Sequence, residues 1–481
     1  MKKLKKLLAL VCALAMTGSV LTAAAWAAPA AVSLQVNGEE VVLTDAAPEI
    51  RSGRTFIPAR AVFEALGAAV TWDEDSRSAV AVKEGTTVVM TIGSETAQVT
   101  ENGATREIAM DVAPYIKGGR TYVPARFAAQ ALDCAVGWDE DARTVIVVDV
   151  PALFGGADFT LMDGWMAASL EETAPDPART SGTASLELTV SDGTETAAYP
   201  LDMTFDILTS GEQMQLQVSM DLSDFLTLLT GGALNGEEQR ELLALCDAAA
   251  EVRMDAAAGK VYFTVDSPLL MYLTGNSMGN GDLWYLLDLG ELFALSGMDY
   301  SALLQEVMAA GAESFDFKDI MIASLAGTEL TDAELDYDML SMTAEGFCAL
   351  FSDQALVKNG NTYAASWEVK DDASGEAAQI DVVYETRGGR LVGMEMDVSA
   401  AAEGQTIDVL TMDVYDDGTN TSMTFDFDLG TMALAFDLTA RTAATSDLPA
   451  IEPPAGSETV DLTEMLTETE TAQPADPGAA A

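Results

Sequence analysis

The residue types that most often carry out chemistry are scarce in this chain. Histidine is absent from all 481 residues, which removes the commonest general base and the commonest transition-metal ligand. Cys12 lies in an apolar N-terminal stretch, and the other cysteines, Cys134, Cys246 and Cys348, are widely spaced and odd in number. That pattern fits neither a zinc site nor a disulfide framework. We expect three small buried side chains, with one disulfide plus a free thiol as the alternative pairing.

Enzyme motifs are missing as well. The sequence has no Gly-x-Ser-x-Gly elbow and no phosphate-binding loop. Two carboxylates can hydrolyse a glycoside, but among 77 Asp and Glu no pair stands out. We therefore predict no catalytic, cofactor-binding or metal-binding residues and a protein that is not an enzyme. A hydrolase that uses carboxylates is the weakest of the functions considered.

The chain is strongly acidic, with a formal net charge of −53. A field of this sign repels nucleic acid and anionic membranes, so we expect no nucleic-acid partner. Carboxylate runs at 73–75 and 139–141 could supply oxygen ligands to calcium, but they lack the glycine and the distal glutamate of a calcium loop. We interpret both runs, and Asp416-Asp417-Gly418, as solvated turns between strands.

One stretch of sequence occurs twice. Arg54-Thr55-Phe56-Ile57-Pro58-Ala59-Arg60 returns 66 residues later as Arg120-Thr121-Tyr122-Val123-Pro124-Ala125-Arg126, and the same offset carries residues 72–75 onto 138–141. A constant offset over this length indicates two copies of one supersecondary unit. Each copy has an Asn-Gly hairpin signal, alternating strands and one short helix that begins near the proline. We expect the two copies to share a core that neither could close alone.

Two arginines and two tryptophans are candidates for function within the repeats. Arg60 and Arg126 stand at the starts of the helices, where we expect buried side chains paired with a carboxylate or with backbone carbonyls; Glu64 is one candidate partner of Arg60. Recognition of an anionic wall polymer is the alternative, and the net charge disfavours it. For Trp72 and Trp138, core packing is favoured over stacking on a sugar.

The doubled motif, with its Asn-Gly turns and its Val-x-Trp-Asp-Glu-Asp-x-Arg segments, resembles the copper amine oxidase N-terminal-like domain, also called the stalk domain. The resemblance covers residues 32–150 and implies a secreted or cell-surface α+β module of Gram-positive-type envelopes. The sequence departs from the family pattern at Gln130, where the first copy keeps Glu64, and at Asp133, where the first copy keeps the helix-ending Gly67. No oxidase activity is implied, because those enzymes use three histidine ligands.

The N-terminus has the pattern of a secretory signal peptide. Met1-Lys2-Lys3-Leu4-Lys5-Lys6 is a basic region, an apolar stretch follows, and Ala25-Trp26-Ala27 supplies a cleavage site. No later apolar run approaches the ~18 residues that a membrane span needs. We expect residues 1–27 to be removed, no transmembrane segment in the mature chain, and a location outside the cytoplasm, secreted or at the cell surface.

The pattern of residue types divides the rest of the chain into three parts. We expect a linker at 151–180 that contains one short helix, an antiparallel α+β domain at 181–445, and a disordered acidic tail at 446–481. Strict alternation of apolar and polar residues predicts antiparallel strands with one wet face. Between the strands, helices are predicted at 222–229, 237–250, 283–295 and 300–309. The fold class is therefore α+β: tandem strand-rich repeats, then a large antiparallel sheet with helices across one face.

That order of elements is similar, in topology only, to the half-barrels of lipoprotein carriers. The similarity implies an apolar cavity suited to an acyl chain. Methionine is frequent in the predicted sheet and would suit an adaptable apolar surface, although ordinary core packing is the favoured explanation. The methionines concerned are Met203, Met214, Met220, Met254, Met271, Met394, Met396, Met412 and Met423.

Two functions follow as hypotheses. The first is a secreted, non-enzymatic envelope protein with a binding or scaffolding role at the cell surface, whose partner is a cell-wall polymer or another surface protein. The alternative is a carrier that holds a lipid or another apolar ligand in the C-terminal domain. A scaffold should have a filled sheet–helix interface, whereas a carrier should have a continuous apolar cavity lined from both the sheet and the central helices.

Overall fold

The structure is a computed structural model, which describes residues 32–463 except for internal gaps. The residues left out are 44–45, 52–53, 102, 140–141, 171–174, 192–195, 231–235, 276–277, 296–298, 302–315, 327–336, 371–375 and 403–404. The predicted signal peptide, most of the predicted helix at 300–309 and the end of the predicted tail lie outside the described residues. No helix in the described part of the chain is both long enough and apolar enough to cross a membrane.

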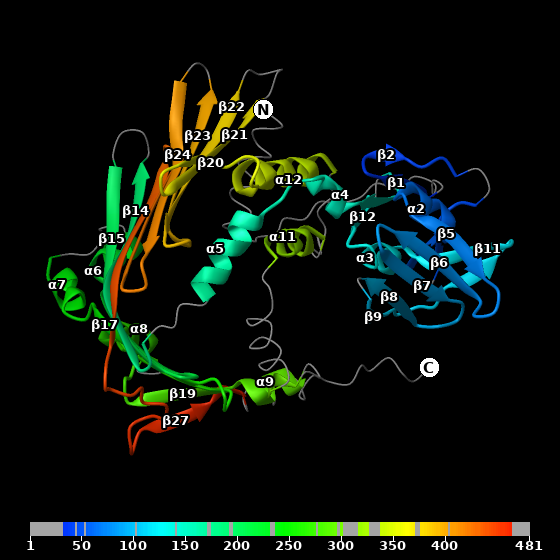
Figure 1. Ribbon diagram of the computed structural model, residues 1–481. Helices are drawn as coiled ribbons and strands as arrows, with labels where there is room; N and C mark the ends of the chain where they lie inside the picture. The colour runs from blue at the N-terminus through cyan, green and yellow to red at the C-terminus, as the bar shows by residue number, and fades with distance from the viewer. Residues whose placement is uncertain are drawn as a thin grey trace. The chain divides into compact units, whose positions relative to one another are not determined.

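The chain forms two compact units. The repeat unit contains residues 2–163 and 316–356, and the sheet unit contains residues 164–315 and 357–481 (Figure 1). Each unit is rich in strands and has a few helices, so the α+β class predicted from the sequence is confirmed.

The two copies of the repeat interlock through their strands. One sheet has the order β12-β13-β1-β2 and the other the order β5-β6-β7-β8-β9. The bounds are β1 (Ser33–Val36), β2 (Glu39–Glu40), β5 (Ala69–Asp73), β6 (Ser78–Lys83), β7 (Thr86–Thr91), β8 (Thr96–Glu101), β9 (Ala104–Ala109), β12 (Ala135–Asp139) and β13 (Thr144–Val148). Each sheet therefore combines the last strands of one copy with the Asn-Gly hairpin of the other. Neither copy can complete a sheet alone.

The repeated motif itself forms the centre of the unit. A third sheet has the order β10-β11-β4-β3, with bounds β3 (Glu49–Arg51), β4 (Arg54–Pro58), β10 (Tyr115–Lys117) and β11 (Arg120–Pro124). In it the two copies of the motif pair with each other in antiparallel fashion, with Ile57 opposite Val123. Both of these side chains are fully buried. The two copies of the motif are therefore related by an approximate two-fold axis that passes between Ile57 and Val123.

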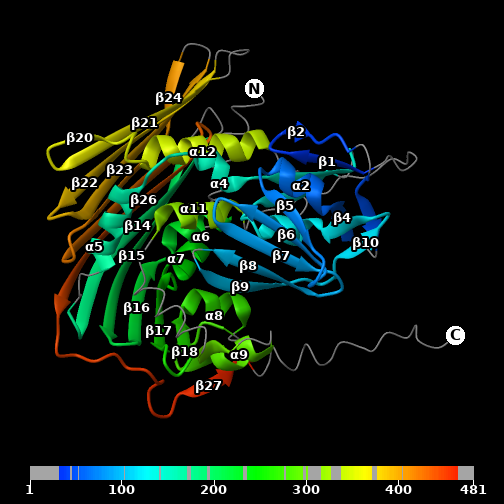
Figure 2. The same ribbon diagram turned by 45° about the vertical axis from the view of Figure 1, so that its right-hand side comes forward.

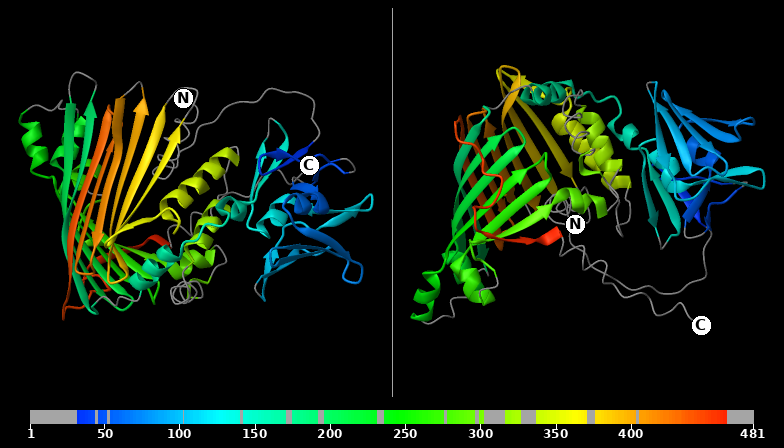
Figure 3. Two further views of the ribbon diagram at one scale, coloured as in Figure 1. Left: turned by 45° about the horizontal axis from the view of Figure 1, so that its top comes forward. Right: turned by 90° about the horizontal axis from the view of Figure 1, so that it is seen from below.

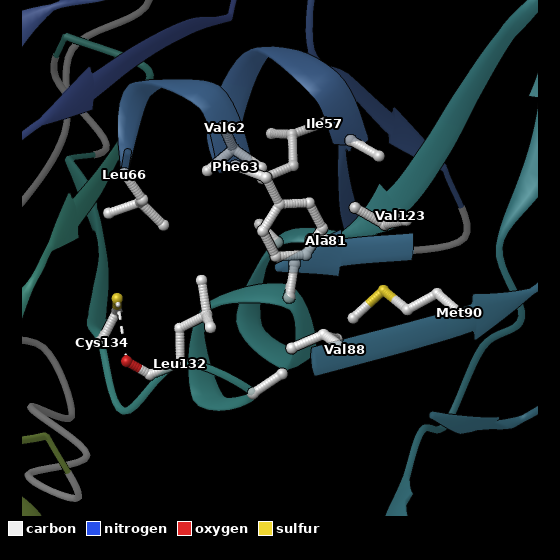
Figure 4. Packing of buried hydrophobic residues seen from close by; sticks show 14 of the residues in the cluster. Ile57, Val62, Phe63, Leu66, Ala81, Val88, Met90, Val123, Leu132 and Cys134 are labelled. Carbon is white, nitrogen blue, oxygen red and sulfur yellow. Dashed lines mark hydrogen bonds between the residues drawn. The ribbon is translucent and has the colours of Figure 1, made fainter. Parts of the chain in front are cut away.

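Helices α2 (Ala59–Ala65) and α3 (Ala125–Gln130) follow the motif in each copy. The inward side of α2 buries Val62 and Phe63, which meet Val88 and Met90 from β7 and Val123 from β11 in one continuous core (Figure 4). The core thus draws on both copies.

The two copies have the same backbone conformation at their tightest turns. Arg77 and Arg143 have left-handed φ angles of 52° and 51° at equivalent places. After the helices, Gly67 has φ 81° and Asp133 has φ 52°. Asp133, where the sequence departs from the family pattern, therefore has the left-handed backbone conformation that glycine adopts without strain. An exposed ion pair joins Asp133 to Arg106, with 3.4 Å between Nη2 and Oδ1.

Residues 151–180 are more structured than the expected linker. Helix α4 (Val150–Phe154) begins there, with Asp149 as its N-terminal cap, and α5 (Thr160–Leu170) covers the helix expected at 161–170. The Asp149 carboxylate is buried and pairs with Lys83. Burial of this pair anchors α4 to the repeats, a constraint that composition alone does not reveal. Helices α11 (Phe317–Ala326) and α12 (Tyr337–Phe351) complete the repeat unit, and both contact α4.

The sheet unit is built on 14 strands in one sheet (Figure 2). The order is β20-β21-β22-β23-β24-β25-β26-β14-β15-β16-β17-β18-β19-β27, and all neighbours are antiparallel except β19 and β27. The bounds are β14 (Ala178–Ser191), β15 (Thr196–Ser210), β16 (Gln213–Asp221), β17 (Asp247–Asp255), β18 (Lys260–Asp266), β19 (Leu283–Asp288), β20 (Val357–Asn359), β21 (Thr362–Lys370), β22 (Ala377–Arg387), β23 (Arg390–Ala402), β24 (Gln405–Asp416), β25 (Asn420–Asp428), β26 (Met432–Ala444) and β27 (Glu458–Asp461).

Two of the predicted helices in this unit are partly wrong. The unit has α6 (Ser223–Thr230), α7 (Glu238–Leu243), α8 (Pro268–Thr274) and α9 (Leu289–Leu295), and α6 confirms the helix expected at 222–229. The sequence at 237–250, however, leaves the helix to form β17, and 283–288 forms β19 before α9 begins. In both cases pairing with a neighbouring strand overrides the local helical pattern.

The first part of the predicted disordered tail is ordered. Arg253 donates from Nη1 to the Glu452 carbonyl, and Gln215 Oε1 accepts from the Ala450 amide at 2.9 Å. The guanidinium of Arg253 also lies 4.6 Å from the ring centre of Trp284. Strand β27 then pairs with β19. These contacts to the sheet supply order that an acidic, proline-rich composition does not predict.

The three described cysteines are all free. Cys134 and Cys246 are buried, as expected, and Cys348 is half-buried. Loss of hydration on burial raises the pKa of all three thiols. They therefore serve as apolar side chains, and the alternative of one disulfide is wrong.

Replacing Gly67 with alanine should destabilise the repeat unit by about 1 kcal/mol, because a Cβ atom is disfavoured at φ 81°. Space is not the cause, since an added Cβ atom would meet nothing within 4 Å. Gly156→Ala is the control, because Gly156 is equally open and has no left-handed φ. Denaturant unfolding of the two variants measures the difference. Equal stability would contradict a backbone role for Gly67.

Candidate binding surfaces

One face of the 14-stranded sheet carries only uncharged, mostly apolar side chains across its regular rows. Side chains alternate along each strand, so the strand register identifies which residues share a face. The register gives three rows across the middle of the sheet. They are Tyr384-Met394-Val414-Met423-Leu438-Ala184-Met203-Met220, Val382-Met396-Met412-Phe425-Phe436-Leu186-Leu201 and Ile380-Val398-Leu410-Phe427-Leu434-Leu188-Tyr199. We call this surface the apolar face.

The apolar face continues onto the other half of the sheet. There the rows run from β15 to β19 and are Phe205-Val218-Ala250-Val265, Ile207-Leu216-Val252-Phe263-Tyr285 and Met214-Met254-Val261-Leu287. Eight of the nine methionines noted in the sequence thus lie on one surface. The ninth, Met271, lies on α8.

The opposite face of the sheet is polar and acidic. Asp413, Thr424 and Asp437 are neighbours on β24, β25 and β26, and Ser185 donates a hydrogen bond of 2.7 Å to Asp202 on the adjacent strands β14 and β15. Water can cover such a face without cost. The apolar face has no such option, because burying apolar area is the main favourable term in folding.

Helix α5 covers one end of the apolar face. Trp165 on α5 packs against Tyr363 and Tyr384 of β21 and β22, with ring centres 4.8 and 5.6 Å apart. Tyr384 and Val382 are each 1% exposed there. Burial raises the pKa of Tyr384.

The middle of the apolar face is more open. Phe205, Phe425, Phe436, Met396 and Met412 are all half-buried, and none of them belongs to the buried core. The sheet curls toward the side that carries α5 without closing into a barrel (Figures 1 and 3). A curved, charge-free apolar surface of this size is characteristic of a ligand or partner site.

The repeat unit has a second candidate, a cleft of about 850 Å³ beside α2. We call it the first-copy cleft. Its lining includes Ala61, Ala65 and Trp72, together with Val42 and Ile116, which are 82% and 45% exposed. Arg60, Glu64 and Arg120 are its charged lining residues.

The structure corrects the expected burial of the two arginines. The Arg60 side chain is 66% exposed, and its Nε lies 3.7 Å from the expected partner, Glu64. Arg126 is also exposed. The reason is which side of the helix faces the core. Val62 and Phe63 lie on the buried side of α2, so Arg60 points toward solvent.

The two tryptophans differ between the copies. Trp138 packs against the repeat core, as predicted. Trp72, at the equivalent position, is half-buried and lines the first-copy cleft. Because both tryptophans occupy the same position of the repeated motif, the sequence predicts core packing for both and does not reveal this difference.

The acidic runs form turns. The Asp73 carboxylate accepts hydrogen bonds from the Ser76 hydroxyl and from the amides of Asp75 and Ser76, and these bonds lower its pKa. In the same way, the amides of Asn420 and Thr419 lower the pKa of Asp417 to about 2. Asp139 accepts from the Ala142 amide at 2.7 Å, while residues 140–141 lie outside the described residues. Among the described residues, no group of carboxylates and thiols is arranged to hold a metal ion.

The comparisons with known proteins identify the repeat region. Residues 35–147 match the family model described as the copper amine oxidase N-terminal domain, so the resemblance predicted from the doubled motif is confirmed. This is the N-terminal, non-catalytic domain of those enzymes. No curated protein matches the chain.

Among solved structures, the crystal structure of MucB in complex with MucA(peri) is similar to part of the chain, at 6% identity and a TM-score of 0.09. The match covers 59% of this chain and 93% of the other. A likeness at that TM-score carries no argument about fold or ligand. The apolar face is therefore argued from its own residues.

Replacing Trp165 with alanine should cost about 3–5 kcal/mol of stability, the usual cost of truncating a buried tryptophan. Trp367→Ala is the matched control. Trp367 lies on the same face of β21 as Tyr363, which contacts Trp165, but Trp367 is only half-buried. We expect that control to cost less than half as much. Urea unfolding followed by circular dichroism measures both, and equal losses would contradict selective cover by α5.

Proposed function

We propose that this protein is a non-enzymatic binding protein of the cell envelope and that it holds an apolar ligand on the apolar face of its large sheet. The observation that carries the proposal is the row pattern itself. More than thirty cross-strand neighbours in the rows given above carry no charge, and those in the middle are half-buried.

The surface suits a long, flexible hydrocarbon, such as the acyl chain of a lipid. Burying apolar area contributes about 25 cal/mol per Å², so a chain laid along several strands would bind through area alone. Methionine side chains adapt to ligands of varied shape, and they recur in the rows beside phenylalanine and leucine. A charged ligand would find no group of opposite charge in these rows.

A location at the cell surface is part of the proposal. It is supported by the signal-peptide pattern of residues 1–27 and by the match of residues 35–147 to a domain family that the resemblance associates with Gram-positive-type envelopes. The repeats would then be the wall-proximal or presenting module, with a cell-wall polymer or a surface protein as the partner. In this arrangement the sheet unit carries the ligand.

The first test is chemical. Purified full-length protein is extracted with organic solvent, and the extract is analysed by mass spectrometry; we expect an acyl-chain compound in stoichiometric amount. Protein stripped in this way should bind a dansyl-labelled fatty acid with a large rise in fluorescence. If no apolar compound is extracted and no probe binds, the apolar-ligand proposal is wrong and the scaffolding hypothesis remains.

Variants on the two faces of one strand make the test specific. Phe425→Lys places an unpaired ammonium on the apolar face, and we expect probe affinity to fall at least about tenfold because burying such a charge is costly. Thr424→Lys is the control, since it points to the polar face between Asp413 and Asp437. Met412→Lys is a second site on the neighbouring strand. Melting curves identify any variant that unfolds, and equal losses from both faces would contradict the assignment.

A further inference from the structure

Two of the helix positions at which the two copies differ, 61 and 64, line the first-copy cleft. Ala61 lines the cleft in the first copy. At the same offset the second copy has Phe127, a half-buried side chain that packs against the repeat core together with Ile108 and Trp138. The second copy therefore supplies its own large side chain where the first copy has only a methyl group.

Burial of a shared alanine shows the consequence. Ala65 and Ala131 are equivalent residues of the same type, and Ala131 is 0% exposed whereas Ala65 is exposed. Ala65 lines the first-copy cleft. The first copy thus leaves open a site of the shape that an aromatic side chain occupies in the second copy.

The lining of the cleft indicates the chemistry of its occupant. The apolar lining is mainly aliphatic, with Val41, Val42, Leu43 and Ile116 around the alanines. A polysaccharide would leave hydroxyl groups against these side chains without partners. A polypeptide segment can instead insert an apolar side chain and keep its backbone toward water.

Charge defines the second feature of the occupant. Among the described residues, the charged groups that line the cleft are Arg60, Arg120 and Glu64. The Arg60 side chain is 66% exposed, with its Nε 3.7 Å from Glu64, so a cationic group is accessible here in a chain whose formal charge is −53. An anionic partner is repelled by most of this protein and attracted here, which favours one docking position.

We propose that the first-copy cleft binds a polypeptide segment of a partner protein that inserts one large apolar side chain beside a carboxylate. This site is separate from the apolar face and does not depend on the function proposed for it. It gives the repeats a protein-recognition role of their own.

The test is selection of peptides on the full-length protein. A phage library of random peptides is panned against the wild type and depleted on Ala61→Phe, which gives the first copy the side chain of the second. We expect the surviving peptides to be enriched in Phe, Tyr, Trp or Leu next to Asp or Glu. Val42→Asp is a second blocking variant at an exposed site, so a folding defect in Ala61→Phe would not hide the result.

Affinities of one selected peptide then separate the contributions. Ala61→Phe and Val42→Asp should each weaken binding at least about tenfold, and Arg60→Gln about two- to fivefold, as expected for a surface ion pair. Arg126→Gln, the equivalent change in the second copy, should have no effect, and neither should Met412→Lys on the sheet. Added salt should weaken binding to the wild type.

Three results would overturn the proposal. The first is that no peptide distinguishes the wild type from Ala61→Phe, and the second is that the survivors lack the apolar–acidic pairing. The third is that soluble cell-wall glycan fragments, rather than peptides, bind in a way that Ala61→Phe abolishes. That third outcome would assign the cleft to a saccharide.

Discussion

The alternation of side chains along antiparallel strands governs the sheet unit. Because successive residues point to opposite faces, a sequence that repeats apolar and acidic residues at every second position separates them completely. All 14 strands lie in one sheet. In the middle of the sheet, one face is polar and acidic. The other is apolar, and α5 covers its end at β21 and β22.

In the repeat unit the governing contact is the pairing of the two motif copies at Ile57 and Val123. Because of this pairing, both copies contribute to one core. The copies differ inside that core, where Ala128 is equivalent to Val62, and also at Ala61 and Phe127. Duplication has thus produced one surface that is closed and one that is open. For the same reason, the family match to the repeats identifies the domain family. It does not identify a ligand, because ligand binding depends on the exposed residues.

The sequence predicts the repeat, the α+β class and the alternating strands correctly, because these follow from local periodicity and an internal offset. It fails where a distant contact decides. Residues 247–250 become strand through pairing with β16, and residues near 450 are ordered by Gln215 and Arg253. The apolar face was visible as alternation, but its openness depends on what packs over it. Likewise, exposure of Arg60 depends on the helix direction, which the spacing of Val62 and Phe63 could have revealed.

The most direct test of ligand binding on the apolar face is a methyl spectrum of full-length protein labelled at its methionines, recorded with a spin-labelled fatty acid. We expect broadening of methyl signals from the apolar face, such as Met203, Met220, Met396 and Met412. Met90, which is fully buried in the repeat core, should be unchanged. Unchanged signals from all four sheet methionines would contradict the claim that this face binds an apolar ligand.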